Sequence, residues 1–425
     1  MPDATVTIRM YNSGFGDCFL ITVTDDARVW RMLVDCGVHS QGRAKVGDAS
    51  RPIDDIVAAV IRQLADECAN GVPRLDAIVA THHHADHISG FALDAWEQVE
   101  VGEVWVPFVE DPDDPDARVL KHGLAEAART LQALVEGATA GRGGARRSPM
   151  ALALDFAVNS RGNAAATARL VEGRFKGDPA NVRVRYLPDT DAAENDIETG
   201  IEGAVVHVLG PSRDPQRLKR MNPPASVRWL EDAFAEHDEQ GDRSQIFDRI
   251  YQLPAAEVEG RIPRELLEAR NSIRVAEVAF DEEAILQATA LLERSVNNTS
   301  VFFVLDVRGT RFIFVGDSQQ GAWEHVLDDP RSRALVTGAA FYKVGHHGSH
   351  NSTPKRFVEE DLGDGATAMV PVAEVKRWKD TIPEHKLIDA LAEKHTRVIR
   401  ADAPAGPGVK TGPDLLWSEV EFTVA

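Results

Sequence analysis

The chain has 425 residues and a formal net charge of −20, from 47 basic and 67 acidic side chains, which disfavours tight nonspecific binding to nucleic acid. No apolar run is long enough to span a membrane, and the N-terminus lacks the pattern of a secretory signal. The three cysteines form no close pairs, so we expect a cytoplasmic protein without disulfides and without a membrane partner.

Runs rich in Val, Ile, Leu and Phe predict strands, and apolar residues spaced three and four apart predict helices. In the first half, the predicted strands are 5–11, 18–24, 29–36, 75–81, 101–108, 182–187 and 203–209. The predicted helices are 53–69, 88–99 and 117–137.

Predicted strands and helices alternate again from residue 299. The predicted strands are 299–307, 311–317, 339–347, 367–372, 396–401 and 417–424, and the predicted helices are 319–328, 354–361 and 383–394. This order predicts two mixed sheets covered by helices, an α/β sandwich with two similar halves. We expect one domain over 1–425, interrupted at 214–293 by a mostly helical insertion that could be a cap or a homodimer surface.

The segment THHHADHISG (81–90) directly follows the apolar strand 75–81. Its residues His82, His84, Asp86 and His87 are typical ligands of zinc, manganese or iron, and those two apart leave a strand on the same side. His83 should point away from them. Such a density of ligands after a buried strand predicts a metal site rather than a polar loop.

Two other predicted strands end in metal-binding residues. RFIFVGD (311–317) ends in Asp317, and YKVGHHGS (342–349) carries His346 and His347. Because ligands gather at the carboxyl ends of strands in open α/β sheets, we expect these side chains to join the first cluster.

The HHHADH run matches the HxHxDH signature of the metallo-β-lactamase-fold hydrolases, and the chain resembles this family over most of its length. It is most similar to the hydrolase domains of the ComEC-type competence DNA-uptake proteins. The segments that carry this resemblance are NSGFGDCFLI (12–21), VDCG (34–37), NNTSVFFVL (297–305) and KVGHHGS (343–349).

The resemblance implies an αββα sandwich that binds two divalent metals, zinc by default and manganese as the rival. It implies these ligands: His82 and His84 for the first metal, Asp86, His87 and His346 for the second, and Asp317 as a bridge. Asp35 would lie behind the site and order its loops. In the catalytic step, Asp86 would orient the attacking water, and His347 or Lys343 would donate a proton to the leaving group.

The chain departs from the family pattern at one position. Most members supply a further histidine before the bridging aspartate, yet the corresponding segment VVHVLGPS (205–212) has no ligand near Gly210. His207 lies nearby, either as a ligand or as a buried structural histidine. The site could therefore work with a single metal.

Three functions remain open. The favoured one is a metal-dependent hydrolase acting on a phosphodiester, with a nuclease as one form of it. The only clear basic cluster is GRGGARR (141–147), so charge does not support nucleic acid, although a metal can reverse the local field. The alternatives are a hydrolase of a small ester or lactone, with 214–293 as a lid, and a non-catalytic metal-binding module of a larger complex.

Overall fold

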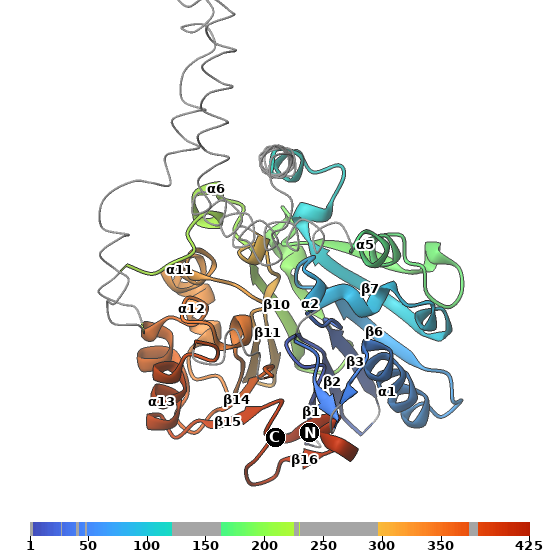
Figure 1. The fold of residues 1–425 in the computed structure, drawn as a ribbon. Coiled ribbons are helices and arrows are strands. Elements are labelled where there is room, and N and C mark those ends of the chain that lie inside the picture. Colours follow the sequence, from blue (N-terminus) through green and yellow to red (C-terminus); the bar gives the residue numbers. More distant parts are fainter. Residues whose placement is uncertain are drawn as a thin grey trace, which may run out of the picture.

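The computed structural model describes residues 3–26, 28–39, 42–46, 49–120, 163–224, 229, 296–373 and 381–425. Within these residues two mixed sheets pack face to face, and helices lie on the outer face of each sheet (Figure 1). The predicted α/β sandwich is therefore confirmed. None of the helices in these ranges is long and apolar enough to cross a membrane.

The first sheet has the strand order β16-β17-β1-β2-β3-β6-β7-β8. Its strands are β1 (Ala4–Tyr11), β2 (Phe19–Thr24), β3 (Val29–Val34), β6 (Arg74–Val79), β7 (Glu100–Pro107), β8 (Arg183–Leu187), β16 (Lys410–Thr411) and β17 (Trp417–Val424). β1 pairs antiparallel with β17, which brings the two ends of the chain together (Figure 1). From β3 to β8 the pairs are parallel, so these strands end at one edge.

The second sheet has the order β15-β14-β13-β12-β11-β10-β9. Its strands are β9 (Asp196–Glu198), β10 (Ala204–Gly210), β11 (Phe302–Val307), β12 (Thr310–Phe314), β13 (Phe341–Lys343), β14 (Thr367–Val370) and β15 (Arg397–Arg400). Strands β9 to β12 pair antiparallel and β12 to β15 pair parallel. A separate small pair joins β4 (Lys45–Val46) to β5 (Ala49–Ser50).

The helices divide between the two outer faces. α1 (Ile53–Glu67) and α5 (Ala164–Val171) pack on the first sheet, whereas α11 (Gln320–Asp328), α12 (Pro330–Val336) and α13 (His385–Glu393) pack on the second (Figure 1). The sequence of α1 explains why it packs on the sheet with one face. Its buried residues recur every three or four positions and so form one apolar stripe (Ile56, Val57, Val60, Ile61 and Leu64). The short helices α2 (Ala85–Ile88) and α6 (Pro215–Leu218) follow strand ends instead.

The core between the sheets comes from alternate residues of facing strands. Val6, Ile8 and Met10 of β1 point inward, toward the second sheet's inner face. On that face Phe303 stacks on Phe314, with ring centroids 5.1 Å apart and planes 12° apart. This buried layer holds together the two sheets whose strand ends carry the predicted ligands.

Two predicted elements differ from the structure. The single helix expected over 88–99 is a series of short turns, Ser89–Ala92 and Asp94–Gln98 after α2, pinned where Trp96 Nε1 donates to the Gly90 carbonyl at 2.9 Å. The strand expected over 339–347 ends at Lys343. His346 and His347 have φ values of 44° and 54°, a left-handed backbone that cannot continue a strand.

Three predicted segments lie largely outside the described residues. These are the helix 117–137 beyond Leu120, the basic loop 141–147, and the insertion 214–293 apart from 214–224 and Trp229. α6 is the part of the insertion that the structure describes as a helix.

Replacing Phe303 with alanine should lower the free energy of unfolding by about 3 to 5 kcal/mol, because it leaves a cavity between the two sheets. Denaturant unfolding would measure this loss. Val119→Ala is the control, since Val119 is 73% exposed and should cost about 0.5 kcal/mol or less. Equal losses in the two variants would contradict the position of Phe303.

Candidate metal centre

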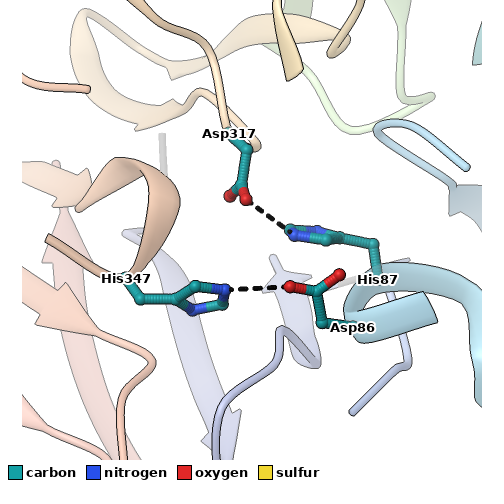
Figure 2. Close-up of side chains that lie close together, drawn as sticks. All are labelled: Asp86, His87, Asp317 and His347. Carbon is teal, nitrogen blue, oxygen red and sulfur yellow. Dashed lines mark hydrogen bonds and ion pairs between the residues drawn. The ribbon is translucent and has the colours of Figure 1, made fainter. Parts of the chain in front are cut away.

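The candidate metal centre lies where strands of both sheets end. Asp86 and His87 belong to α2, shortly after β6, while Asp317 follows β12 and His347 follows β13. One ligand atom from each of these residues lies within 4.8 Å of the others (Figure 2). We call this group the Asp/His cluster. Two carboxylates and two imidazoles at this spacing could hold a metal ion.

Two contacts link the half of the cluster that follows β6, Asp86 and His87, to the half that follows β12 and β13, Asp317 and His347. His87 Nε2 lies 3.1 Å from Asp317 Oδ2, and His347 Nε2 lies 3.3 Å from Asp86 Oδ2 (Figure 2). Each contact joins a residue near the first sheet to one near the second. The cluster therefore exists only when the two sheets are packed.

The other ring nitrogens show that the cluster suits a cation. His347 Nδ1 lies 2.7 Å from the carbonyl oxygen of Pro371, and His87 Nδ1 lies 2.8 Å from Asp35 Oδ2. Because both partners are acceptors, Nδ1 is the donor in each ring, and a neutral ring points its Nε2 lone pair at a carboxylate. Two lone pairs repel, so each contact needs a proton or a metal ion, and a divalent metal fits this donor set.

The pKa shifts of the histidines agree with this excess of negative charge. Burial opposes protonation of His87, but Asp317, Asp17 and Asp35 outweigh burial and raise its pKa well above the usual value. Burial likewise opposes protonation of His347, yet its hydrogen bond to Asp86 and the charge of Asp317 raise its pKa. In the metal-free protein, protons therefore take the positions on Nε2 at which a metal would bind.

Asp35 lies behind His87 and carries several contacts at once. Its Oδ1 accepts from the backbone N–H of Thr81 and its Oδ2 from the Thr81 hydroxyl, both at 2.7 Å, while Oδ2 also faces His87. Its backbone has a φ of 57°. A carboxylate behind a ligating histidine fixes the ring orientation and makes the imidazole a better ligand.

Gly316 allows Asp317 to reach the cluster. Its φ is 53°, and a Cβ there would lie 2.8 Å from the Cβ atoms of Thr81 and Ser300. Ser300 Oγ accepts from the Asp317 backbone N–H at 3.1 Å and also contacts His82 Nδ1 at 3.2 Å. The loop after β12 is thus held against the His82 loop.

His82 and His84 form a second buried pair, with His82 Nε2 3.0 Å from His84 Nδ1. Burial lowers the pKa of His84 to about 3, so the ring is neutral near pH 7 and able to ligate. Among the residues placed by the structure, no further histidine, cysteine or carboxylate completes a group of three with this pair. His207 lies on β10 with its Nδ1 2.7 Å from Asp196 Oδ1, on β9.

The remaining expected residues lie beside the cluster. His346 donates its backbone N–H to Asp317 Oδ1 at 3.1 Å, and its Nε2 is 3.8 Å from Asp317 Oδ2, but it is not one of the residues grouped within 4.8 Å. Lys343, expected as a proton donor, is buried, and its ammonium group pairs with Asp17. His83 points toward Glu110 instead, with its Nδ1 3.0 Å from Glu110 Oε1.

Asp17 is a residue whose role the sequence did not predict. It is fully buried among charged groups, and it lies within 4 Å of His87, His347 and Lys343. The only signal was the glycine-aspartate pair in NSGFGDCFLI, an acidic residue between two apolar strands. Such a pair is as common in exposed turns, so the contacts of Asp17 could not be inferred from it.

Replacing His347 with alanine should weaken metal binding more than replacing His346, because only His347 lies in the Asp/His cluster. We expect a loss for His347→Ala above the roughly 100-fold typical of residues behind a metal site, and a smaller loss for His346→Ala. Titrating the metal-free variants against a chelating indicator would measure both. The reverse order would make His346 the ligand.

Replacing Asp35 with asparagine should weaken metal affinity roughly 10- to 100-fold. The amide can present N–H to His87 Nδ1, which favours the ring form with its proton on Nε2, where a metal would bind. Glu110→Gln is the matched control, because Glu110 contacts His83 and is not one of the residues of the Asp/His cluster. Equal affinities in both variants would show that Asp35 does not orient His87.

Comparison with known proteins finds a distant relative of part of the chain. No family model matches the chain. A segment of 151 residues, 35% of the chain, is 27% identical to the ComE operon protein 3 of Bacillus subtilis (strain 168). The match covers 18% of that relative's length, so the chain corresponds to a small part of it. This weak similarity agrees with the competence-type resemblance and, with the Asp/His cluster, suggests a metal-dependent hydrolase in general terms.

Proposed function

We propose that this chain is a metallo-β-lactamase-type hydrolase that cleaves phosphodiesters with the help of a bound divalent metal. The observation that carries the proposal is the Asp/His cluster, with its four ligand atoms within 4.8 Å at the ends of strands from both sheets. The HxHxDH signature and the distant similarity to a ComE operon protein support it.

In this proposal Asp86, His87, Asp317 and His347 hold one metal, and His347 takes the place first expected for His346. The pair His82 and His84 offers two further nitrogens beside it. When bound, a divalent metal acts as a Lewis acid that polarises a substrate oxygen and lowers the pKa of water. Mixed carboxylate and imidazole ligands suit zinc, with manganese as the rival.

The chain's own residues then have distinct tasks. Asp86 presents its second carboxylate oxygen next to the cluster and can orient the attacking water through a hydrogen bond. Asp35 and the Pro371 carbonyl hold the imidazoles of His87 and His347 through their Nδ1 atoms. We assign proton donation to neither His347 nor Lys343, because both are buried and already engaged.

Two substrate classes are compatible with the Asp/His cluster. A phosphodiester fits the competence-type motifs, and nucleic acid is one source of it. The net charge of −20 favours a small substrate over a polymer, which keeps a small-ester or lactone hydrolase as a second candidate. One fold hosts many hydrolytic reactions, so only turnover can separate these candidates.

The protein should cleave bis-p-nitrophenyl phosphate after it is stripped of metal and reloaded with Zn²⁺ or Mn²⁺. Asp86→Asn should reduce the rate at least about 100-fold, since it removes both a ligand charge and the group that orients water. His207→Ala is the control, because His207 pairs with Asp196 on β9, and it should retain full activity.

Other outcomes would redirect the proposal. Saturable cleavage of a small ester or lactone without cleavage of the phosphodiester would favour the second candidate. Bound metal without turnover of either substrate would favour a non-catalytic metal-binding module. A purified protein that binds no divalent metal would refute the proposal.

A further inference from the structure

The two halves of the Asp/His cluster come from different sheets, so their distance depends on how the sheets are held together at this edge. Asp86 and His87 follow β6 of the first sheet, whereas Asp317 and His347 follow strands of the second. Metal sites tolerate little variation in ligand distance. An interaction that joins the loops of the two sheets beside the cluster would therefore set the distances between its ligand atoms.

Lys343 and Asp17 make such an interaction. Lys343 is the last residue of β13 in the second sheet, and Asp17 lies in the loop between β1 and β2 in the first. Both side chains are almost completely buried, and they form an ion pair across the two sheets. The Lys343 ammonium group also donates to the Gly316 carbonyl at 2.8 Å and lies 3.6 Å from Asp317 Oδ1. Lys343 thus holds the Asp317 loop.

Asp17 holds the loop that carries Asp86 in the same way. Its backbone N–H donates to the Asp86 carbonyl at 2.9 Å, and its carbonyl accepts from the Gly37 N–H at 3.0 Å. The neighbouring Gly16 permits this approach, because a Cβ there would lie 2.9 Å from the Asp86 carbonyl oxygen. The carboxylate of Asp17 reaches 3.7 Å from His87 Nδ1.

Charge explains why a lysine is buried here. Asp17, Asp35, Asp86 and Asp317 crowd around the centre, and buried carboxylates are costly unless cations accompany them. Burial opposes the charge on Lys343, but Asp17 and Asp317 outweigh burial and raise its pKa, so the side chain stays an ammonium.

Asp17, Asp35 and His87 form another buried group whose ligand atoms lie within 4.8 Å of one another. The Lys343 ammonium already lies against Asp17, and His87 Nδ1 already faces Asp35. The place beside Asp17 is therefore filled by a cation that belongs to the chain.

We propose that the Asp17–Lys343 ion pair is a positioning device that joins the two sheets beneath the metal centre and sets the distance between its halves. The inference rests on the proposed metal centre. In this inference, neither Asp17 nor Lys343 binds the metal or the substrate, so both are positioning residues. Lys343 is therefore not the proton donor.

The test compares Asp17→Asn, Lys343→Met and the double variant with wild type. The metal affinity of each metal-free protein is measured by competition with a chelating indicator, and stability by thermal unfolding without metal. We expect each single variant to bind Zn²⁺ roughly 10- to 100-fold more weakly. The double variant should lose about as much as one single variant, because both changes break the same pair.

The buried Arg9–Glu419 pair supplies a matched control. It joins β1 to β17 within the first sheet, with Arg9 Nε 2.8 Å from Glu419 Oε2. Arg9→Met and Glu419→Gln should lower thermal stability but leave Zn²⁺ affinity within about 2-fold of wild type. A merely structural role of Asp17 and Lys343 would produce this same pattern.

The outcomes separate the inference from the proposed function. Wild type that binds no metal would refute both. Wild type that binds metal, with Asp17→Asn and Lys343→Met variants of unchanged affinity, would overturn the inference alone. If those variants do not fold, Asp17→Glu decides instead, since it keeps the charge and moves the carboxylate by one methylene. It should fold and bind Zn²⁺ more weakly, and unchanged affinity would again overturn the inference.

Discussion

Carboxylates from each sheet face imidazoles from the other across the edge where β6, β12 and β13 end. Asp317 meets His87, and Asp86 meets His347, with a carboxylate oxygen 3.1 Å and 3.3 Å from Nε2, respectively. Since Nδ1 of both rings is already engaged, these contacts are favourable only when a positive charge lies between them. The surrounding structure serves to hold this arrangement of charges.

Supporting residues act at increasing distance from the centre. Asp35 and the Pro371 carbonyl orient the imidazoles, and Thr81 in turn fixes Asp35. Beyond them, the Asp17–Lys343 pair links the loops of the two sheets. The apolar layer of Phe303 and its neighbours then keeps the sheets together. Each of these groups of residues holds the side chains that lie closer to the centre in place, as a metal site requires.

The asymmetry of the site bears on its metal content. The Asp/His cluster has four ligand groups, whereas His82 and His84 form a pair without a third ligand among the described residues. Under the proposed function, this difference favours one strongly held metal over two equal ones. The distant ComE operon relative shares only part of its length with this chain, so the substrate has to be sought with this chain itself.

The sequence by itself determined where the strands around the centre lie along the chain and which loops carry the residues of the Asp/His cluster. Runs rich in Val, Ile, Leu and Phe mark β1, β6, β11 and β12, and a dense run of histidine and aspartate after an apolar strand is typical of a metal site. These features are local, so a linear pattern contains them.

Only the tertiary structure decided which ring of the histidine pair enters the cluster, and it placed His207 beside Asp196. Left-handed backbone at His346 and His347 rotates their side chains in a way that no periodicity encodes. The contact of Asp17 with Lys343 spans more than three hundred residues. Such a pair forms because two buried charges need each other once the sheets have packed, a condition that exists only in the folded chain.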